Sequence, residues 1–187
     1  MDVEGKIPRA LEALGPIAGA GVVLVGAADE LRIRQLADLG ARVTAVSEAD
    51  VAQLPAGGAD VIAGFWSWFR DDLPGTLRVA ERAIHDGGRV LVLHDYGRDD
   101  VSRFHAPDRP EYTAWSRRDG WFLQTGFRVR VIHCWWTFES VAEARAFLDD
   151  AFGASASAVG AGLTRPRLSH NVAIYHRTKG GGPEGPS

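Results

Sequence analysis

Short apolar runs recur along the first half of the chain, and they constrain its fold more than any other sequence feature. Val22–Val25 and Val61–Gly64 are continuously apolar, and Arg89–Leu93 is apolar after its first residue. Strands of this kind are buried on both faces, which is typical of a parallel sheet covered by helices. Segments 29–40 and 72–88 lie between these strands and carry apolar residues at helical spacing. Strands and helices therefore alternate, which predicts a doubly wound, mainly parallel α/β sheet.

The rest of the chain is predicted to add further helices and strands. Helices are expected at 7–14, at 111–124 and behind a capping box of Ser140 and Glu143, and strands at Arg42–Val46, Phe127–Phe138 and Val172–Tyr175. Residues 94–110 are polar, charged and proline-containing, which predicts a long loop behind a buried strand. We expect 96–110 to act as a mobile lid that a bound ligand orders.

Composition limits the class of protein. The 187 residues correspond to one domain at roughly 150 residues per domain, expected over 1–178, with a Gly- and Pro-rich disordered tail at 179–187. A net charge of −3 shows no basic excess for nucleic acid or anionic lipid. The single cysteine, Cys134, excludes an internal disulfide framework and a cysteine-built zinc site. No signal peptide or membrane-length apolar run is seen, so we expect a cytoplasmic protein with a small-molecule substrate.

Gly26 marks the first candidate binding position. In an open α/β sheet, ligands bind outside the carboxyl ends of the strands. Gly26 leads from the first strand into a helix whose N-terminal amides attract an anion. This pattern indicates a nucleotide or nucleoside cofactor, but a glycine needed only for a tight turn explains it equally well.

Four segments in order carry a family resemblance. They are Val22–Gly26 with Gly40–Val46 after a helix, Asp50–Pro55 with Gly57–Ile62, Gly87–Val92, and Gly126–Phe127. In this order and spacing the chain resembles, from about Val22 to Arg177, the class I S-adenosylmethionine-dependent methyltransferases. The resemblance implies a Rossmann-like three-layer α/β/α fold in which the last strand runs antiparallel between the fifth and sixth strands.

The resemblance also implies S-adenosylmethionine as cofactor. It assigns cofactor contacts to Gly26, Ala27, Ala28, Ser47, Glu48, Asp50, Val51 and Phe65. The sequence departs from the family in two places. The acidic-x-G-x-G-x-G stretch falls on Leu24, Gly26, Ala28 and Glu30, and the acidic residue for the ribose falls on Ser47. Glu48 is the adjacent carboxylate and the stronger candidate acceptor.

Three polar residues behind the Arg89–Leu93 strand are the catalytic candidates: His94, Asp95 and Tyr96. His94 is the candidate general base because imidazole titrates near neutral pH, although it could equally cap the strand. Asp95 could orient His94, bind a substrate amine or cap the loop. The turn at 97–100 is expected to contain an internal ion pair.

Aromatic and charged residues are candidate substrate contacts. Trp66 and Trp68 follow the Val61–Gly64 strand, where the family places a wall of its active site, and Arg98 lies in the loop. An aromatic beside a strand can equally be core. His133 and Cys134 lack companion ligands at useful spacing, so no metal site is expected.

Two alternatives to a methyltransferase stay open. One is a non-catalytic protein of methyltransferase fold that serves binding or interaction. The other is an NAD-type dinucleotide-binding protein, which is disfavoured because Gly26 lacks the further glycines of G-x-G-x-x-G and the chain has no Tyr-x-x-x-Lys pair. The sequence does not specify the oligomeric state.

Overall fold

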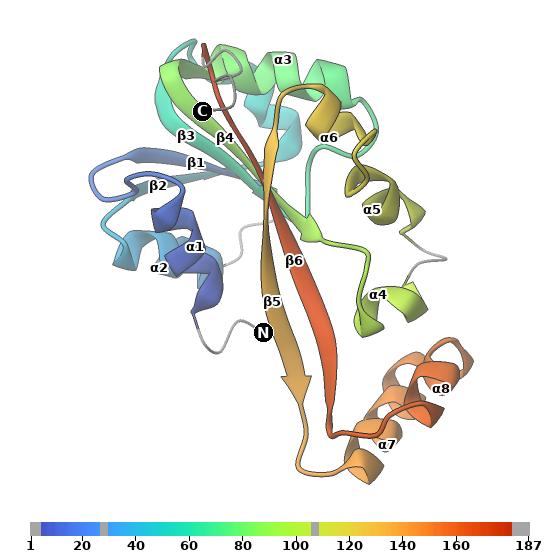
Figure 1. Ribbon diagram of the computed structural model, residues 1–187. Coiled ribbons are helices and arrows are strands. Elements are labelled where there is room, and N and C mark those ends of the chain that lie inside the picture. Colours follow the sequence, from blue (N-terminus) through green and yellow to red (C-terminus); the bar gives the residue numbers. More distant parts are fainter. Residues whose placement is uncertain (1–4, 27–29, 106–108, 181–187) are drawn as a thin grey trace, which may run out of the picture. The chain divides into compact units, whose positions relative to one another are not determined.

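The computed structural model describes residues 5–26, 30–105 and 109–180 (Figure 1). The chain divides into two compact units. The first unit comprises 1–94, 126–130 and 174–187, and the second comprises 95–125 and 131–173. The expected single domain over 1–178 stays a prediction, and residues 181–187 of the expected tail lie outside the described residues.

A six-stranded sheet organises the first unit, and three of its strands extend into the second. In chain order the strands are β1 (Gly21–Val25), β2 (Arg42–Val46), β3 (Ala59–Phe65), β4 (Ile84–Asp95), β5 (Arg128–Thr137) and β6 (Arg167–Thr178). Their order across the sheet is β2-β1-β3-β4-β6-β5. β1 pairs in parallel with β2 and with β3, and β3 pairs in parallel with β4. The predicted mainly parallel sheet is confirmed.

The last strand lies where the family resemblance places it. The amide of Lys179 donates to the carbonyl of Gly88, and the amide of Tyr96 donates to the carbonyl of Asn171. Residue numbers rise along β4 while they fall along β6, so the two strands are antiparallel. Because β6 also lies between β4 and β5, the predicted antiparallel insertion is confirmed. The strand itself is longer than the predicted Val172–Tyr175.

Helices cover both faces of the first unit's sheet. They are α1 (Lys6–Ala13), α2 (Glu30–Asp38) and α3 (Leu73–Ala83), with a 3-10 helix η1 at Glu48–Gln53. The β1–α2–β2 and β3–α3–β4 connections cross the sheet in opposite directions. Right-handed crossovers then place α2 and α3 on opposite faces (Figure 1). The three-layer arrangement is therefore confirmed.

The predicted end of α3 is wrong by about one turn. Asp72 caps the helix as expected, since its carboxylate accepts the Gly75 amide at 2.9 Å. The helix stops at Ala83, however, and Ile84 is fully buried as the first residue of β4. Ala59 pairs with Ile84 and Val61 with Arg89, so β4 carries extra residues in a bulge. Pairing with β3 overrides the local helical spacing.

The described residues of the second unit form the helices α4 (Asp100–His105), α5 (Pro110–Trp115), α6 (Trp121–Gln124), α7 (Val141–Phe152) and α8 (Ala154–Ala161). The predicted loop over 94–110 is wrong at α4. The predicted helix over 111–124 is interrupted at Gly120, where a side chain would collide with carbonyl oxygens of the preceding turn. Residues 106–108 of the expected lid lie outside the described residues, and the lid stays a prediction.

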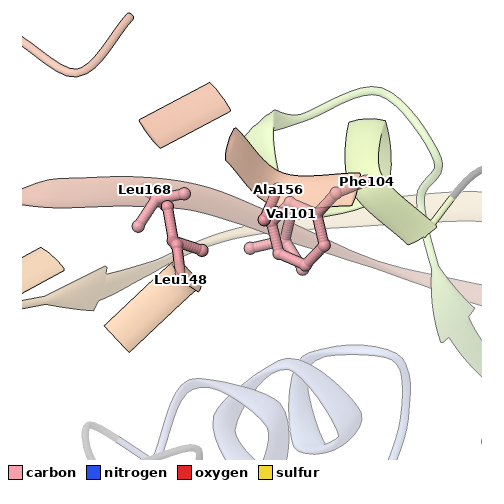
Figure 2. Packing of buried hydrophobic residues seen from close by; sticks show 5 residues of the cluster. All are labelled: Val101, Phe104, Leu148, Ala156 and Leu168. Atoms are coloured by element: carbon pink, nitrogen blue, oxygen red, sulfur yellow. The ribbon is translucent and has the colours of Figure 1, made fainter. Parts of the chain in front are cut away.

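A hydrophobic cluster lies within the described part of the second unit (Figure 2). It comprises Val101, Phe104, Leu148, Ala156 and Leu168, and each is at most 3% exposed. The cluster joins α4, α7, α8 and β6. The sequence did not predict α8. Its buried residue Ala156 has a small side chain, which becomes part of an apolar cluster only when α7 packs against it. No described helix is long and apolar enough to cross a membrane.

Candidate active site

Gly26 ends β1 in a conformation that favours glycine. Its φ is +119°, and its amide donates to the carbonyl of Val46 at the end of β2. A Cβ at this position would collide with the side chain of Ser67. The hydroxyl of Ser67 donates to the carbonyl of Val25 at 2.9 Å. The Ser67 side chain therefore fills the space beside Gly26, where the sequence predicted that a cofactor approaches the backbone. Ala27 and Ala28 lie outside the described residues.

Ser67 belongs to a strained aromatic turn, Trp66–Phe69, which follows β3. Trp66, Trp68 and Phe69 have φ values of 53°, 60° and 52°. Bulky side chains rarely adopt this left-handed conformation, which costs on the order of 1–3 kcal/mol per residue. The amide of Trp66 donates to the carbonyl of Leu93, and Phe69 is fully buried. The surrounding contacts therefore hold the aromatic turn in its shape.

Glu48 connects the end of β2 to the aromatic turn. Its Oε1 accepts the backbone amide of Trp68 at 2.9 Å. Ser47 is engaged elsewhere, because its hydroxyl caps η1 and donates to Asp50 Oδ2 at 2.6 Å. Val51 is 1% exposed and anchors η1 in the core. Ser47 and Glu48 were both expected near the ribose. The Ser47 hydroxyl binds within η1, and one oxygen of the Glu48 carboxylate binds the aromatic turn.

The two candidate tryptophans have different environments. Trp68 is 5% exposed and packs edge-on against Phe69, with ring centroids 4.9 Å apart, so it is a core residue. Trp66 is partly exposed and lies under the guanidinium of Arg32, 5.3 Å from its ring centroid. Arg32 also lies 6.0 Å from the ring of Phe65. Trp66 is therefore the less buried of the two tryptophans, and its ring contacts a cation.

His94 lies inside β4, contrary to the expectation that it leaves the strand. It is completely buried, so it does not present the open imidazole expected of a general base. Asp95 is the last residue of β4. It contacts His170, and Asp95 Oδ1 lies 3.1 Å from Nε2 of that ring. His170 is on β6, 75 residues along the chain. The contact between Asp95 and His170 could be predicted only from the pairing of β4 with β6, which are neighbours in the sheet.

The loop after Tyr96 is held by contacts different from those expected. Arg98 lies 5.5 Å from the Tyr96 ring and donates to the hydroxyl and carbonyl of Ser116. The predicted ion pair within 97–100 is therefore wrong. Asp99 instead accepts the amides of Ser102 and Asn171, both at 2.8 Å. Among the described residues no group of three or more His, Cys, Asp or Glu side chains could hold a metal.

Comparison with known proteins was informative only at the level of structure. No protein-family model and no curated protein matches the sequence. A candidate type II methyltransferase from Anaeromyxobacter dehalogenans is 16% identical, with a TM-score of 0.51 over 91% of this chain and 95% of that one. A candidate sarcosine dimethylglycine methyltransferase from Galdieria sulphuraria is 12% identical, with a TM-score of 0.51 over 94% and 85%.

The YcgJ protein of Bacillus subtilis is similar to the same extent. It is 13% identical, with a TM-score of 0.51 over 96% of this chain and 100% of that one. The chain has a class I methyltransferase fold. At these identities the likeness establishes the fold, in agreement with the strand order and the antiparallel β6. The chemistry of the site must be argued from its residues.

Proposed function

We propose that this protein is an S-adenosylmethionine-dependent methyltransferase acting on a small molecule. The observation that carries the proposal is the Glu48 carboxylate, which begins η1 two residues after the end of β2 in a chain of methyltransferase fold. A carboxylate behind the second strand suits a ribose diol, because it accepts two charge-assisted hydrogen bonds.

The residues at this edge fit the cofactor. A carboxylate offers about four lone-pair sites, so the Trp68 amide leaves Glu48 able to accept from a ribose hydroxyl as well. Gly26 itself has no side chain, but the Ser67 side chain beside it has to move before a cofactor can approach the end of β1. Phe65 adds an apolar wall, while Asp50 would act from η1 beside the buried Val51. Ala27 and Ala28 complete the proposed cofactor set.

When bound, S-adenosylmethionine supplies a methyl group on a sulfonium centre. The chain has to orient an acceptor, exclude water and remove a proton where the acceptor needs it. Trp66, whose ring lies under the Arg32 guanidinium, is a proposed substrate contact, and so is Arg98. Asp95 and Tyr96 stay the proposed catalytic residues, while His94 is fully buried.

A second candidate is a non-catalytic protein of the same fold. It is favoured by one observation: the side chain of Ser67 lies where a Cβ of Gly26 would be, and Glu48 already caps the aromatic turn. In this case the aromatic turn permanently occupies the space at the end of β1 where a cofactor would bind. In the enzyme, the turn has to shift or share Glu48 when the cofactor binds.

Calorimetric titration separates these candidates. An enzyme is expected to bind S-adenosylmethionine and S-adenosylhomocysteine in the micromolar range, about −8 kcal/mol, and to ignore NADH. Glu48→Ala should weaken binding roughly ten- to over a hundred-fold. Glu48→Gln keeps an acceptor for the Trp68 amide and loses only the charge.

The matched control is Glu12→Ala, which removes an exposed carboxylate from α1 and should bind like the parent. Binding of NADH alone would support a dinucleotide-binding protein. Absence of binding by all three ligands would leave the non-catalytic candidate. Equal binding by the parent and Glu48→Ala would remove the ribose role of Glu48.

A further inference from the structure

Positive charges gather around one histidine in the first unit. His176 lies on β6, which has β4 and β5 as its neighbours in the sheet. After burial, the charges of Arg128, Arg130 and Arg89, in that order, lower the pKa of His176. Arg128 and Arg130 lie on β5 and Arg89 lies on β4, and all four residues belong to the first unit. Cationic groups therefore act on this imidazole from both neighbouring strands.

The two arginines on β5 are placed to act together. Alternate residues of a strand share a face and lie about 7 Å apart along it, so Arg128 and Arg130 project to the same side of β5. Both side chains are exposed, while His176 is half-buried. Among the described residues, Arg130 forms no ion pair. Its guanidinium is therefore accessible to a ligand from solution.

No carboxylate balances these charges at His176. Within the part of the chain that the structure describes, every charge that shifts the pKa of His176 belongs to an arginine. The charge of Asp60 acts on Arg89, but that carboxylate already binds the Gly21 amide and His85. Nη1 of Arg89 is buried and has no hydrogen-bond partner among the same residues. The cluster thus carries positive charge that its described surroundings do not neutralise.

An anion would remove the repulsion within this cluster. Like charges that face each other on neighbouring strands are destabilising. A guanidinium binds phosphate oxygens through two parallel, charge-assisted hydrogen bonds. Two guanidiniums on one face can therefore hold one phosphate group, whereas a carboxylate has oxygens for only one such pair of bonds. The net charge of the whole chain is −3, so the positive charge is local and suits a small anion better than a long polyanion.

We propose that Arg128, Arg130 and His176 bind a small phosphate compound, either inorganic phosphate or a phosphate monoester. The two guanidiniums hold the phosphate oxygens, and the imidazole becomes a further donor when it takes up a proton from solution. Arg89 contributes its charge from β4. None of these residues is a proposed cofactor contact, so the inference does not depend on the methyltransferase function.

Inorganic phosphate is the first probe, followed through the imidazole signals of His176 in NMR spectra at pH 7 and constant ionic strength. The signals should shift saturably, with half-saturation at about 1 mM or below. The pKa of His176 should rise, because a bound anion stabilises the imidazolium. Arg128→Gln and Arg130→Gln should each weaken phosphate binding about ten-fold or more. Arg34→Gln removes an exposed arginine from α2 and is the matched control, which should bind like the parent.

Two results of this titration would overturn the proposal. One is a shift of the His176 signals that is equally large when chloride replaces phosphate. The other is an unchanged phosphate affinity in the double variant Arg128→Gln/Arg130→Gln.

Thermal unfolding tests the repulsion and shows that the variants fold. Without phosphate, the double variant should have the same Tm as the parent or a higher one, because it lacks two like charges. At ten times its Kd, phosphate should raise the Tm of the parent and of Arg34→Gln by about 3–6 °C, and that of the double variant much less. Equal increases in the parent and the double variant would contradict a phosphate site at these arginines.

Glycerol 3-phosphate distinguishes the two sources of the phosphate group. Tighter binding of glycerol 3-phosphate than of inorganic phosphate would identify the ligand as a phosphate monoester, and the reverse order would identify it as free phosphate. Both results support the site. Binding of a single-stranded oligonucleotide by a protein that binds neither small compound would overturn it in favour of a nucleic-acid surface.

Discussion

Each unit of this protein contains an acid–histidine pair, and the two pairs differ in exposure. In the first unit, Asp60 accepts the Gly21 amide at 2.6 Å and contacts His85 on the surface, while Glu48 accepts the Trp68 amide. In the second unit, Asp95 binds a histidine ring and Asp100 binds a serine hydroxyl as well as its amide. Carboxylates directed at the backbone hold loops in place, while those directed at side chains also position groups that can take part in chemistry.

The difference follows from what each unit buries. The first unit buries the aliphatic strands β1, β3 and β4, which give it an extended apolar core. The second unit relies on helices that are mostly short; α4 and α5 have six residues each, below the roughly 12–15 at which an isolated helix becomes stable. Aromatic packing and the acidic segment therefore supply its order.

The largest expected effect comes from the core of the second unit. Leu148→Ala removes a fully buried side chain from the cluster in Figure 2 and should cost about 2–5 kcal/mol of unfolding free energy. Hydrogen exchange should accelerate at the amides of Val101 and Leu168 and stay slow at Val23. Leu91→Ala, in β4 of the first unit, is the matched control and should accelerate Val23 first. Equal acceleration at all three amides in both variants would show that the units unfold as one.

The next effect concerns the glycine at the end of β1. Gly26→Ala should cost about 1–3 kcal/mol, because the residue has a positive φ and the new Cβ meets the side chain of Ser67. Adding Ser67→Gly to this variant should restore the stability that is lost through the collision. The loss that comes from the positive φ should remain. Urea unfolding of the two single variants and the double variant measures the coupling. If the stability losses of the two single variants add up in the double variant, Ser67 does not fill the space beside Gly26.

A smaller effect is expected at the acidic segment. Asp100→Asn weakens the acceptor that holds both the amide and the hydroxyl of Ser169, and should cost about 1–2 kcal/mol. Asp150→Asn changes an exposed carboxylate on α7 and is the control. Chemical unfolding followed by tryptophan fluorescence is a suitable measurement. Identical stabilities for the two variants would remove the structural role of Asp100.

The smallest effect is a pH dependence within the first unit. The carbonyl of Asp86 and then the carboxylate of Asp60 raise the pKa of His85 above its usual 6.5. Its stabilising contribution is therefore complete below pH 6.5 and is lost as the pH rises through the raised pKa. His85→Gln should be less stable than the parent at pH 5.5, with the gap closing by pH 8.5.

His176 provides a contrast of opposite sign. Burial, followed by the charge of Arg128, lowers the pKa of His176. Stability is then lost as the pH falls from 6.5 towards the lowered pKa, because the unfolded chain binds a proton first. His176→Gln should therefore gain stability over the parent at acidic pH. Parallel pH profiles of free energy of unfolding for the two variants would contradict both assignments.

Local sequence determined much of the fold. The apolar runs predicted β1, β3 and the second half of β4, and Asp72 and Ser140 predicted the starts of two helices, because burial periodicity and capping depend on residues a few positions apart. The family resemblance added the antiparallel insertion of β6, which no local pattern encodes. Helices α4 and α8 were not predicted, because they pack against each other although they lie far apart in the chain.

The candidate site depended more strongly on tertiary structure. Glu48 and Gly26 were recognisable because a strand end and its next residues are adjacent in sequence. The contact of Glu48 with Trp68, the position of Ser67 and the pairing of Asp95 with His170 connect segments 20, 42 and 75 residues apart. Sequence thus determined which residues follow each strand. Only the packing of those strands decided which side chains meet, because hydrogen bonds require distances of about 3 Å that spacing along a chain does not specify.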